Sequence, residues 1–226
     1  MKTLIVCCTR ERPERAKKML DSIIQTTSGE YSVIFLIDID DPKLNEYIKL
    51  LYPMKCNTNI GIRQTTTFLI NTAFSLHNNF DYYHITNDDF IYKTKDWNKK
   101  FIDKLEENKY GVCYGNDLLQ KENMPTAPFI SGNIVRELGW LQMPTLKHLG
   151  GDCVWGAIGK GLNKLFYFPE IIIEHVHYQA RKAVIDNVYQ RTNSSEMYQK
   201  DSEAYREWYK KEYQGQIDRI RMVLHD

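Results

Sequence analysis

Residues 3–8, TLIVCC, form an uninterrupted apolar run, and residues 9–23, TRERPERAKKMLDSI, follow it directly. An apolar run without alternation is typical of a strand that is buried on both faces of a parallel sheet. In the second stretch Pro13 suits a first helical turn, and the apolar residues after it recur at helical spacing. These residues are Ala16, Met19, Leu20 and Ile23. The two stretches together predict a β-α unit.

The same alternation continues along the chain. Residues 31–38, YSVIFLID, predict a second strand, and residues 44–51 predict a second helix. A third cycle starts at residue 54 with a helix over 65–76, and residues 81–86, DYYHIT, predict the next strand. Strands that alternate with helices indicate an α/β fold, here a single domain with a mostly parallel central sheet flanked by helices.

The pattern is less regular in the second half. Asp96 predicts the N-cap of a further helix, and residues 110–114 predict a further strand. The polar, proline-containing stretch 115–128 predicts a loop long enough to act as a lid. From Asn193 onward, a pattern like a capping box opens one long C-terminal amphipathic helix, which we expect to pack on the same domain.

The composition is that of a folded globular protein and argues against several functional classes. The chain has 226 residues, of which 42% are apolar and 26% charged, which suits one domain with a substantial core. Its net charge of +1 gives no field that would draw it onto nucleic acid or an anionic membrane. The five cysteines include no C-x-x-C pair and predict reduced core thiols. No apolar stretch approaches the roughly 18 residues that span a bilayer, so we expect a cytoplasmic protein.

Polar and charged side chains gather where the predicted strands end. They are Thr9, Arg10 and Arg12 after the first strand, Asp38 and Asp40 after the second, Asn87, Asp88 and Asp89 after the fourth, and His175 and His177 near a later one. In open parallel sheets, ligands bind beyond the carboxyl ends of the strands. We therefore expect these residues to surround one ligand site.

Residues 87–89, NDD, are the strongest candidate for a metal site. Adjacent carboxylates at a strand end can bind a divalent cation that grips a diphosphate, although Asn and Asp also end strands in ordinary turns. In residues 171–178, IIIEHVHY, period-two geometry turns His175 and His177 to one face. Either histidine could complete the shell of Mn²⁺, or alternatively Mg²⁺, and a purely structural histidine pair is an equal alternative.

Asp152 is a further carboxylate of interest. It lies in residues 150–163, GGDCVWGAIGKGLN, where we expect a helix to begin. A carboxylate at that point would be held at the N-terminus of the helix, and its simpler role is to cap it. The glycines of this stretch match neither the phosphate-loop spacing nor the dinucleotide-binding spacing.

Taken in order, these motifs resemble those of the GT-A-fold glycosyltransferases, especially the inverting family 2 enzymes, over roughly residues 3–178. Residues 4–23 look like the first strand and helix, whose loop touches the nucleotide base, and DIDDP at residues 38–42 resembles the acidic motif that contacts uracil or ribose. Residues 57–74, NTNIGIRQTTTFLINTAF, are similar to the stretch that would bring Gly61 and Arg63 near the donor.

The remaining motifs supply the metal, sugar and base positions of that resemblance. NDD at residues 87–89 looks like the DXD motif, with Asp89 as the metal ligand and Asn87 in the place of the first aspartate. Residues 129–140, FISGNIVRELGW, resemble the segment that shapes the sugar pocket through Ser131, Gly132 and Asn133. Gly151-Asp152 resembles the Glu-Asp motif that supplies the catalytic base, with Gly151 in the place of the glutamate.

The resemblance implies a metal-dependent inverting glycosyltransferase that moves a sugar from a nucleotide diphosphate, with UDP-sugars favoured, to an acceptor hydroxyl. Residues 1–178 would form the catalytic domain and residues 179–226 a helical extension. The acceptor would be a glycan, or a modified nucleic-acid base if the weak likeness of residues 191–211 to the C-terminal arms of small virus-encoded glycosyltransferases is sound. Neither the acceptor nor the oligomeric state can be read from the chain.

Two other functions fit part of the pattern. A nucleotidyltransferase of related fold would carry a glycine- and arginine-rich loop after the first strand, whereas residues 8–18, CTRERPERAKK, contain no glycine. A non-catalytic module that binds a nucleotide sugar or nucleic acid is opposed by the near-neutral charge and by the lack of an aromatic and basic binding motif.

Overall fold

The computed structural model describes residues 1–51, 57–61 and 65–224. Within these residues the strands are β1 (Lys2–Cys8), β2 (Glu30–Asp38), β3 (Asn57–Gly61), β4 (Tyr82–Asn87), β5 (Phe90–Tyr92), β6 (Val112–Asn116), β7 (Phe129–Ser131) and β8 (Leu165–His175). The helices are α1 (Pro13–Thr26), α2 (Leu44–Leu51), α3 (Thr66–Leu76), α4 (Trp97–Glu107), α5 (Gly132–Leu138), α6 (Gly151–Gly161), α7 (Asn187–Thr192), α8 (Ser195–Lys211) and α9 (Tyr213–Leu224).

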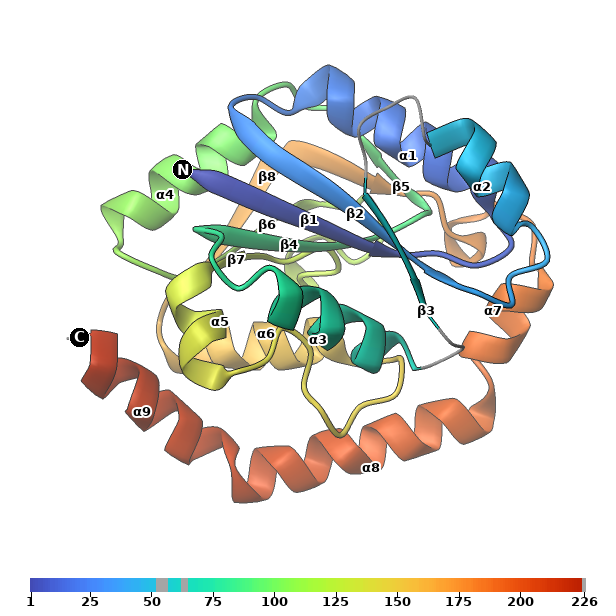
Figure 1. Ribbon diagram of the computed structural model, residues 1–226. Coiled ribbons are helices and arrows are strands. Elements are labelled where there is room, and N and C mark those ends of the chain that lie inside the picture. Colours follow the sequence, from blue (N-terminus) through green and yellow to red (C-terminus); the bar gives the residue numbers. More distant parts are fainter. Residues whose placement is uncertain (52–56, 62–64, 225–226) are drawn as a thin grey trace.

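The strands that the structure describes form one eight-stranded sheet in the order β3-β2-β1-β4-β7-β6-β8-β5 (Figure 1). β1 pairs in parallel with β2 and β4, β2 with β3, and β6 with β8. β7 runs antiparallel to both of its neighbours, and β5 runs antiparallel to β8. The expected mostly parallel sheet is thus present, but it is mixed because two three-residue strands are reversed.

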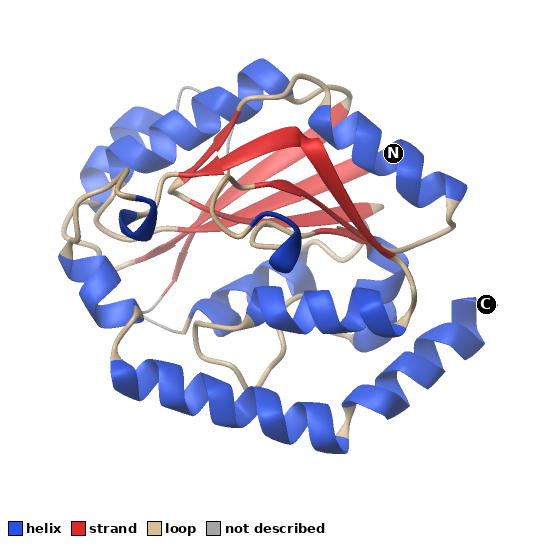
Figure 2. Ribbon diagram, turned by 180° about the vertical axis from the view of Figure 1, so that it is seen from behind, coloured by secondary structure: helices blue, strands red, loops and turns tan. Residues whose placement is uncertain are grey.

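Helices cover both faces of the sheet, so that the core has two layers (Figures 1 and 2). Helices α1, α2 and α4 cover one face, where Met19, Tyr47 and Trp97 pack against alternate residues of the central strands. Helices α3, α5 and α6, together with α9, cover the other face, where Trp155 is fully buried. Burial on both faces is why the first two strands read as uninterrupted apolar runs.

The C-terminal segment differs from the single helix that the sequence predicts. The cap is Ser194, whose side chain accepts a hydrogen bond from the N–H of Met197 at 3.2 Å, and the helix ends near Glu212. A second helix, α9, then changes direction, so that Ile217 and Ile220 reach the core cluster beside α6. The bend gives the aromatic and aliphatic residues of the segment two different surfaces to pack against.

Two further expectations differ in detail. Asp96 is the N-cap residue of α4, as predicted, but it has a left-handed conformation and its side chain makes no capping hydrogen bond. Residues 171–178 do not form one continuous strand, because β8 runs from residue 165, where the run 165–168 pairs with β6 before a bulge, and ends at His175. His177 lies beyond the strand.

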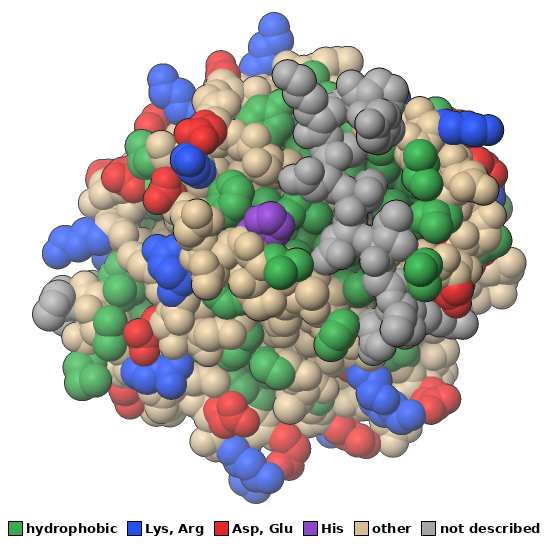
Figure 3. Space-filling view, viewed as in Figure 1, with side chains coloured by type: hydrophobic (Ala, Val, Ile, Leu, Met, Phe, Trp, Pro, Cys, Tyr) green, Lys and Arg blue, Asp and Glu red, His purple; other side chains and the backbone are tan. Residues whose placement is uncertain are grey.

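The cysteines, the helix lengths and the surface charges can each be seen in the structure. Cys7, Cys8, Cys113 and Cys153 are free thiols, as expected, and Cys56 lies outside the described residues. None of the helices described here combines the length and the apolar character that crossing a bilayer requires. Figure 3 shows acidic and basic side chains interspersed over one face of the molecule, in keeping with the net charge of +1.

One buried carboxylate ties the C-terminal helix to the loop that precedes α6. Asp201 of α8 is 3% exposed. Its Oδ1 accepts a hydrogen bond from the N–H of Lys147 at 2.7 Å, and its Oδ2 accepts from the N–H groups of His148 and Leu149 at 2.9 and 2.6 Å. A single side chain thus fixes three successive peptide groups of this loop.

We predict that Asp201→Ala lowers the free energy of unfolding by about 1–3 kcal/mol, because three backbone donors lose their acceptor. Urea unfolding followed by circular dichroism measures the change. Glu203→Ala is the matched control, since Glu203 lies on the same helix and is exposed. Equal stability of the two variants would show that Asp201 does not anchor the loop.

Candidate active site

A cavity opens at the carboxyl ends of the central strands. Its volume is about 670 Å³. From the ends of β1, β2 and β4 it is lined by Thr9, Arg10, Arg12, Asp38, Asn87 and Asp88. His175 and His177 line it from the end of β8, and Asp152 lines it from the first turn of α6. Residues that the sequence placed at separate strand ends therefore meet in one cleft, as the rule for open α/β sheets requires.

Asp88 is held against the first strand. Its Oδ2 accepts a hydrogen bond from the Thr9 hydroxyl at 2.6 Å, and its Oδ1 lies 3.3 Å from Nη1 of Arg12. Burial raises the pKa of Asp88, and the charge of the adjacent Asp89 raises it further, whereas Arg12 and Thr9 oppose that rise. Asp88 therefore holds the Thr9 hydroxyl and the Arg12 guanidinium in position in the cleft.

Arg12 joins this strand end to the C-terminal segment. Its Nε and Nη2 donate to the two oxygens of Asp186 at 2.8 and 2.6 Å, and its guanidinium carbon lies 3.9 Å from the ring centroid of Tyr189. The Tyr189 hydroxyl donates to Oδ2 of Asp89 at 2.8 Å. Helix α7, which the sequence did not predict, thus contributes directly to the site.

Arg10 forms a second charged cluster at the end of β2. Its Nη1 donates to Asp38 Oδ2 at 3.0 Å and to Asp40 Oδ1 at 2.6 Å. Asp38 is paired in register with Gly61, the last residue of β3, so the backbone of Gly61 lies beside this cluster. Arg63, the other residue expected there, lies outside the described residues.

Asp89, His175 and His177 form a group with the donor atoms of a metal site. One candidate ligand atom from each residue lies within 4.8 Å of the others. Oδ1 of Asp89 is buried without a hydrogen-bond partner, and so is Nδ1 of His175, which lies 3.8 Å from an Asp117 oxygen. Carboxylate oxygen together with imidazole nitrogen suits Mn²⁺, so the residues present fit a divalent cation.

The charges around His175 are also those of a cation site. Burial lowers the pKa of His175, but the facing carboxylates of Asp117 and Asp89 outweigh that effect and raise its pKa to about 9. The Nε2 of His175 lies 3.4 Å from Asp89 Oδ2. A proton on His175 thus satisfies the two carboxylates, and a metal ion that binds here must displace it.

Asp152 lies in the first turn of α6, as expected, but Gly150 is the N-cap. Its Oδ1 accepts a hydrogen bond from the N–H of Cys153 at 2.8 Å. Burial raises its pKa, and its bonds with Cys153 and the charge of His175 partly offset that rise. The glycine before it leaves room for Gln142, because a Cβ atom on Gly151 would lie 2.3 Å from the side-chain amide of Gln142 and that side chain would have to move.

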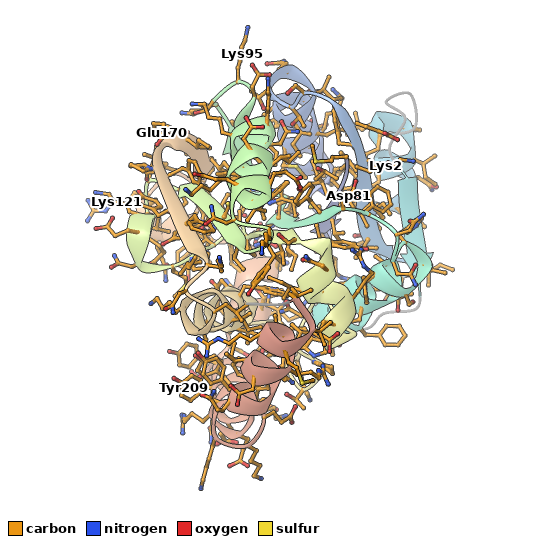
Figure 4. The ribbon with its side chains drawn as sticks, turned by 90° about the vertical axis from the view of Figure 1, so that its left-hand side faces the viewer. Lys2, Asp81, Lys95, Lys121, Glu170 and Tyr209 are labelled. Atoms are coloured by element: carbon orange, nitrogen blue, oxygen red, sulfur yellow. The ribbon has the colours of Figure 1, made fainter. Side chains whose placement is uncertain are left out.

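Ser131, Gly132 and Asn133 do not reach the cleft, contrary to the expected role in the sugar pocket. Because β7 is antiparallel to β4, Ser131 pairs with Tyr82 at the amino end of β4. The N–H of Gly132 donates to the carbonyl of Asp81, a residue that Figure 4 shows beside Lys2 at the opposite end of the sheet. The reversal of one short strand therefore removes all three residues from the site.

The predicted lid loop borders the cleft with residues such as Gln120 and Met124. Oδ1 of Asp117 accepts hydrogen bonds from the N–H groups of Leu119, Gln120 and Lys121 at 2.7 to 2.9 Å, and its Oδ2 accepts one from Thr126. Burial raises the pKa of Asp117, but His175 and these donors lower it to about 2. The loop is thus linked to His175 through the carboxylate of Asp117.

The comparisons with known proteins concern the fold. No protein-family model and no curated protein sequence matches the chain. Among solved structures, the mannosyltransferase PcManGT from Pyrobaculum calidifontis, in complex with GDP-Man and Mn²⁺, matches with a TM-score of 0.63 and 9% identity, over 97% of this chain and 73% of that one. S. aureus TarS 1–349 in complex with UDP-GlcNAc matches with a TM-score of 0.59 and 13% identity, over 82% of this chain and 62% of that one.

TarS 1–349 in complex with UDP matches with a TM-score of 0.58 and 11% identity, over 76% of this chain. The chain spans 59% of the length of that structure. At such low identities the likeness shows the fold, which is GT-A-like, as the sequence motifs predict. A shared fold does not fix the activity, which depends on the residues of the site.

We predict that His177→Ala weakens the binding of Mn²⁺ to the purified protein by about tenfold or more, because it removes one of three ligands. Isothermal titration calorimetry with MnCl₂ measures the affinity. His77→Ala serves as the control, since His77 follows α3 and lies outside the group of Asp89, His175 and His177. Mn²⁺ affinity that is the same in both variants would rule out this site.

Proposed function

We propose that this protein is a metal-dependent inverting glycosyltransferase that transfers a sugar from a nucleotide diphosphate to an acceptor hydroxyl. The observation that carries the proposal concerns the carboxylates of the cleft. Among the described residues, three aspartates line it: Asp38, Asp88 and Asp152. Asp38 is paired with Arg10 and Asp88 with Arg12, whereas Asp152 makes no ion pair within the described chain. A carboxylate without a direct ion pair is suited to accept a proton.

The donor would bind across the ends of β1, β2 and β4. Thr9, Arg10 and Arg12 would form one wall for the nucleotide, and Asp38 with Asp40 would contact the base or the ribose, next to the backbone of Gly61. Asn87 and Asp88 would face the diphosphate. The UDP-sugar that the motifs favour agrees with the UDP and UDP-GlcNAc in two of the TarS complexes, whereas the PcManGT complex holds GDP-Man.

Asp89, His175 and His177 would hold Mn²⁺ or Mg²⁺. When bound, the cation would neutralise the negative charge that develops on the diphosphate as it departs. Around that position, Tyr189 orients the carboxylate of Asp89 through its hydroxyl, and Asp117 faces His175 from the loop. These contacts hold the side chains of Asp89 and His175 in place before a metal ion or a donor binds.

In the reaction that we propose, Asp152 takes the proton from the acceptor hydroxyl. The acceptor oxygen forms a bond to the anomeric carbon while the bond from that carbon to the diphosphate oxygen breaks. Attack from the face opposite the nucleotide inverts the anomeric centre. Burial raises the pKa of Asp152 above its ordinary value of 3.8, which makes it a stronger base than an exposed aspartate.

We predict that Asp152→Asn lowers the turnover of sugar transfer by about 10²-fold or more, because the general base is lost while the shape of the side chain is kept. Donor affinity should change little. Asp218→Asn on α9 is the control, since Asp218 is exposed and does not line the cleft. Turnover in Asp152→Asn that matches the control would remove Asp152 from the mechanism.

We predict that a UDP-sugar together with Mn²⁺ raises the melting temperature more than GDP-, CDP- or dTDP-sugars do, and that EDTA abolishes the gain. A thermal-shift screen of the four donors with and without Mn²⁺ makes the measurement. Analysis of the products completes the test. Release of a nucleoside diphosphate supports a glycosyltransferase, whereas release of pyrophosphate would identify a nucleotidyltransferase.

A further inference from the structure

A second cavity adjoins the cleft on the far side of Asp152. Its volume is about 400 Å³, within the range of roughly 300–1,000 Å³ that is usual for small-molecule sites. The loop residues Asn123 and Pro125 form one side, Lys160 of α6 lies on another, and Tyr209 of α8 faces them. Asp152 and Met124 line both cavities. Asp152 therefore borders both spaces.

Three tyrosines form one wall of this second cavity. Tyr205 and Tyr209 are one turn apart on α8, and Tyr213 begins α9. The ring centroids of Tyr205 and Tyr209 are 6.0 Å apart with an angle of 27° between the planes, and those of Tyr209 and Tyr213 are 4.5 Å apart with an angle of 15°. The rings thus stack on one another as a short ladder.

The polar groups of this wall are available to a ligand. The Tyr213 hydroxyl donates to the carbonyl of Ala157 at 3.1 Å. Within the described residues, the hydroxyls of Tyr205 and Tyr209 have no recorded hydrogen-bond partner, and Tyr209 is 50% exposed. Figure 4 shows Tyr209 at the edge of the C-terminal helices. Each tyrosine hydroxyl can both donate and accept a hydrogen bond.

The arrangement of the rings favours one class of ligand. A flat nucleobase binds by laying its face on an aromatic ring, but Tyr209 already stacks with the rings of Tyr205 and Tyr213. What the wall offers instead is ring edges and hydroxyls, with the Lys160 ammonium and the Asn123 amide nearby. Many separate donors and acceptors around a partly apolar surface match a molecule that carries several hydroxyl groups.

We propose that this second cavity binds the acceptor, and that the acceptor is a carbohydrate. One of its hydroxyls would reach Asp152 from the second cavity while the donor occupies the cleft. The role of Asp152 in this arrangement rests on the glycosyltransferase function proposed above. The binding of a carbohydrate beside Tyr209 does not, and it can be measured without any donor.

The test is saturation-transfer NMR on the full chain without nucleotide. The probes are the methyl glycosides of glucose, galactose, mannose and N-acetylglucosamine, with thymidine and 5-hydroxymethyl-deoxycytidine as the nucleoside arm. We expect at least one glycoside to bind, and Tyr209→Ala and Lys160→Ala each to weaken its binding by roughly fivefold or more. Tyr198→Ala is the matched control, because Tyr198 lies on the same helix, is 68% exposed and lines neither cavity.

Each outcome decides the proposal. Binding that falls in Tyr209→Ala and Lys160→Ala, but not in Tyr198→Ala, supports it. The absence of glycoside binding, an equal loss in Tyr198→Ala, or binding of the nucleosides alone with the same dependence on Tyr209 would overturn it. UDP and GDP binding in Mn²⁺ is measured in parallel on every variant and should not change. If glycosides bind but no nucleotide does, the glycosyltransferase function fails while the carbohydrate site stands.

Discussion

The site depends on the buried guanidinium of Arg12. It lies between the carboxylate of Asp88 at the end of β4 and that of Asp186 before α7, and it is stacked on the ring of Tyr189. Burial alone would lower the pKa of Arg12, but Asp186 and Asp88 outweigh it and raise that pKa above its ordinary value. The Arg12–Asp88 pair is buried on both sides, and removing one partner of such a pair typically costs about 3–5 kcal/mol. Asp186 is 35% exposed, so its pair with Arg12 contributes less. Arg12 therefore fixes the position of the segment before α7 relative to the ends of β1 and β4.

This arrangement gives neighbouring carboxylates different roles. Asp88 and Asp89 are adjacent in sequence, yet Asp88 contacts Thr9 and Arg12, whereas Asp89 contacts His175 and Tyr189. Asp152 is held by the backbone N–H of its own helix and by no cation among the described residues. Different electrostatic surroundings thus give the three carboxylates different roles. Asp88 holds Thr9 and Arg12 in position, Asp89 can bind a metal ion, and Asp152 can accept a proton.

Much of the fold could be predicted because the signals are local. The buried strands and the amphipathic α1 follow from hydrophobic periodicity, and α2 has the predicted bounds of residues 44 and 51. The three-residue strands β5 and β7 are too short to give a periodic signal, and the direction of β7 is what misplaced Ser131 and its neighbours.

The site could be predicted only in part, for a similar reason. The polar residues at the ends of parallel strands were found because the sheet brings such ends together. Asp186, Tyr189 and Asp201 act through partners that lie from 52 to 174 positions away in sequence, so no local pattern marks them. The contacts of these three residues also determine when the site can form during synthesis of the chain. During synthesis, residues 1–175 carry every strand that the structure describes, but Arg12, Asp89 and the loop before α6 still lack their partners at that stage. The contacts that order the site can therefore form only after residue 201 has left the ribosome.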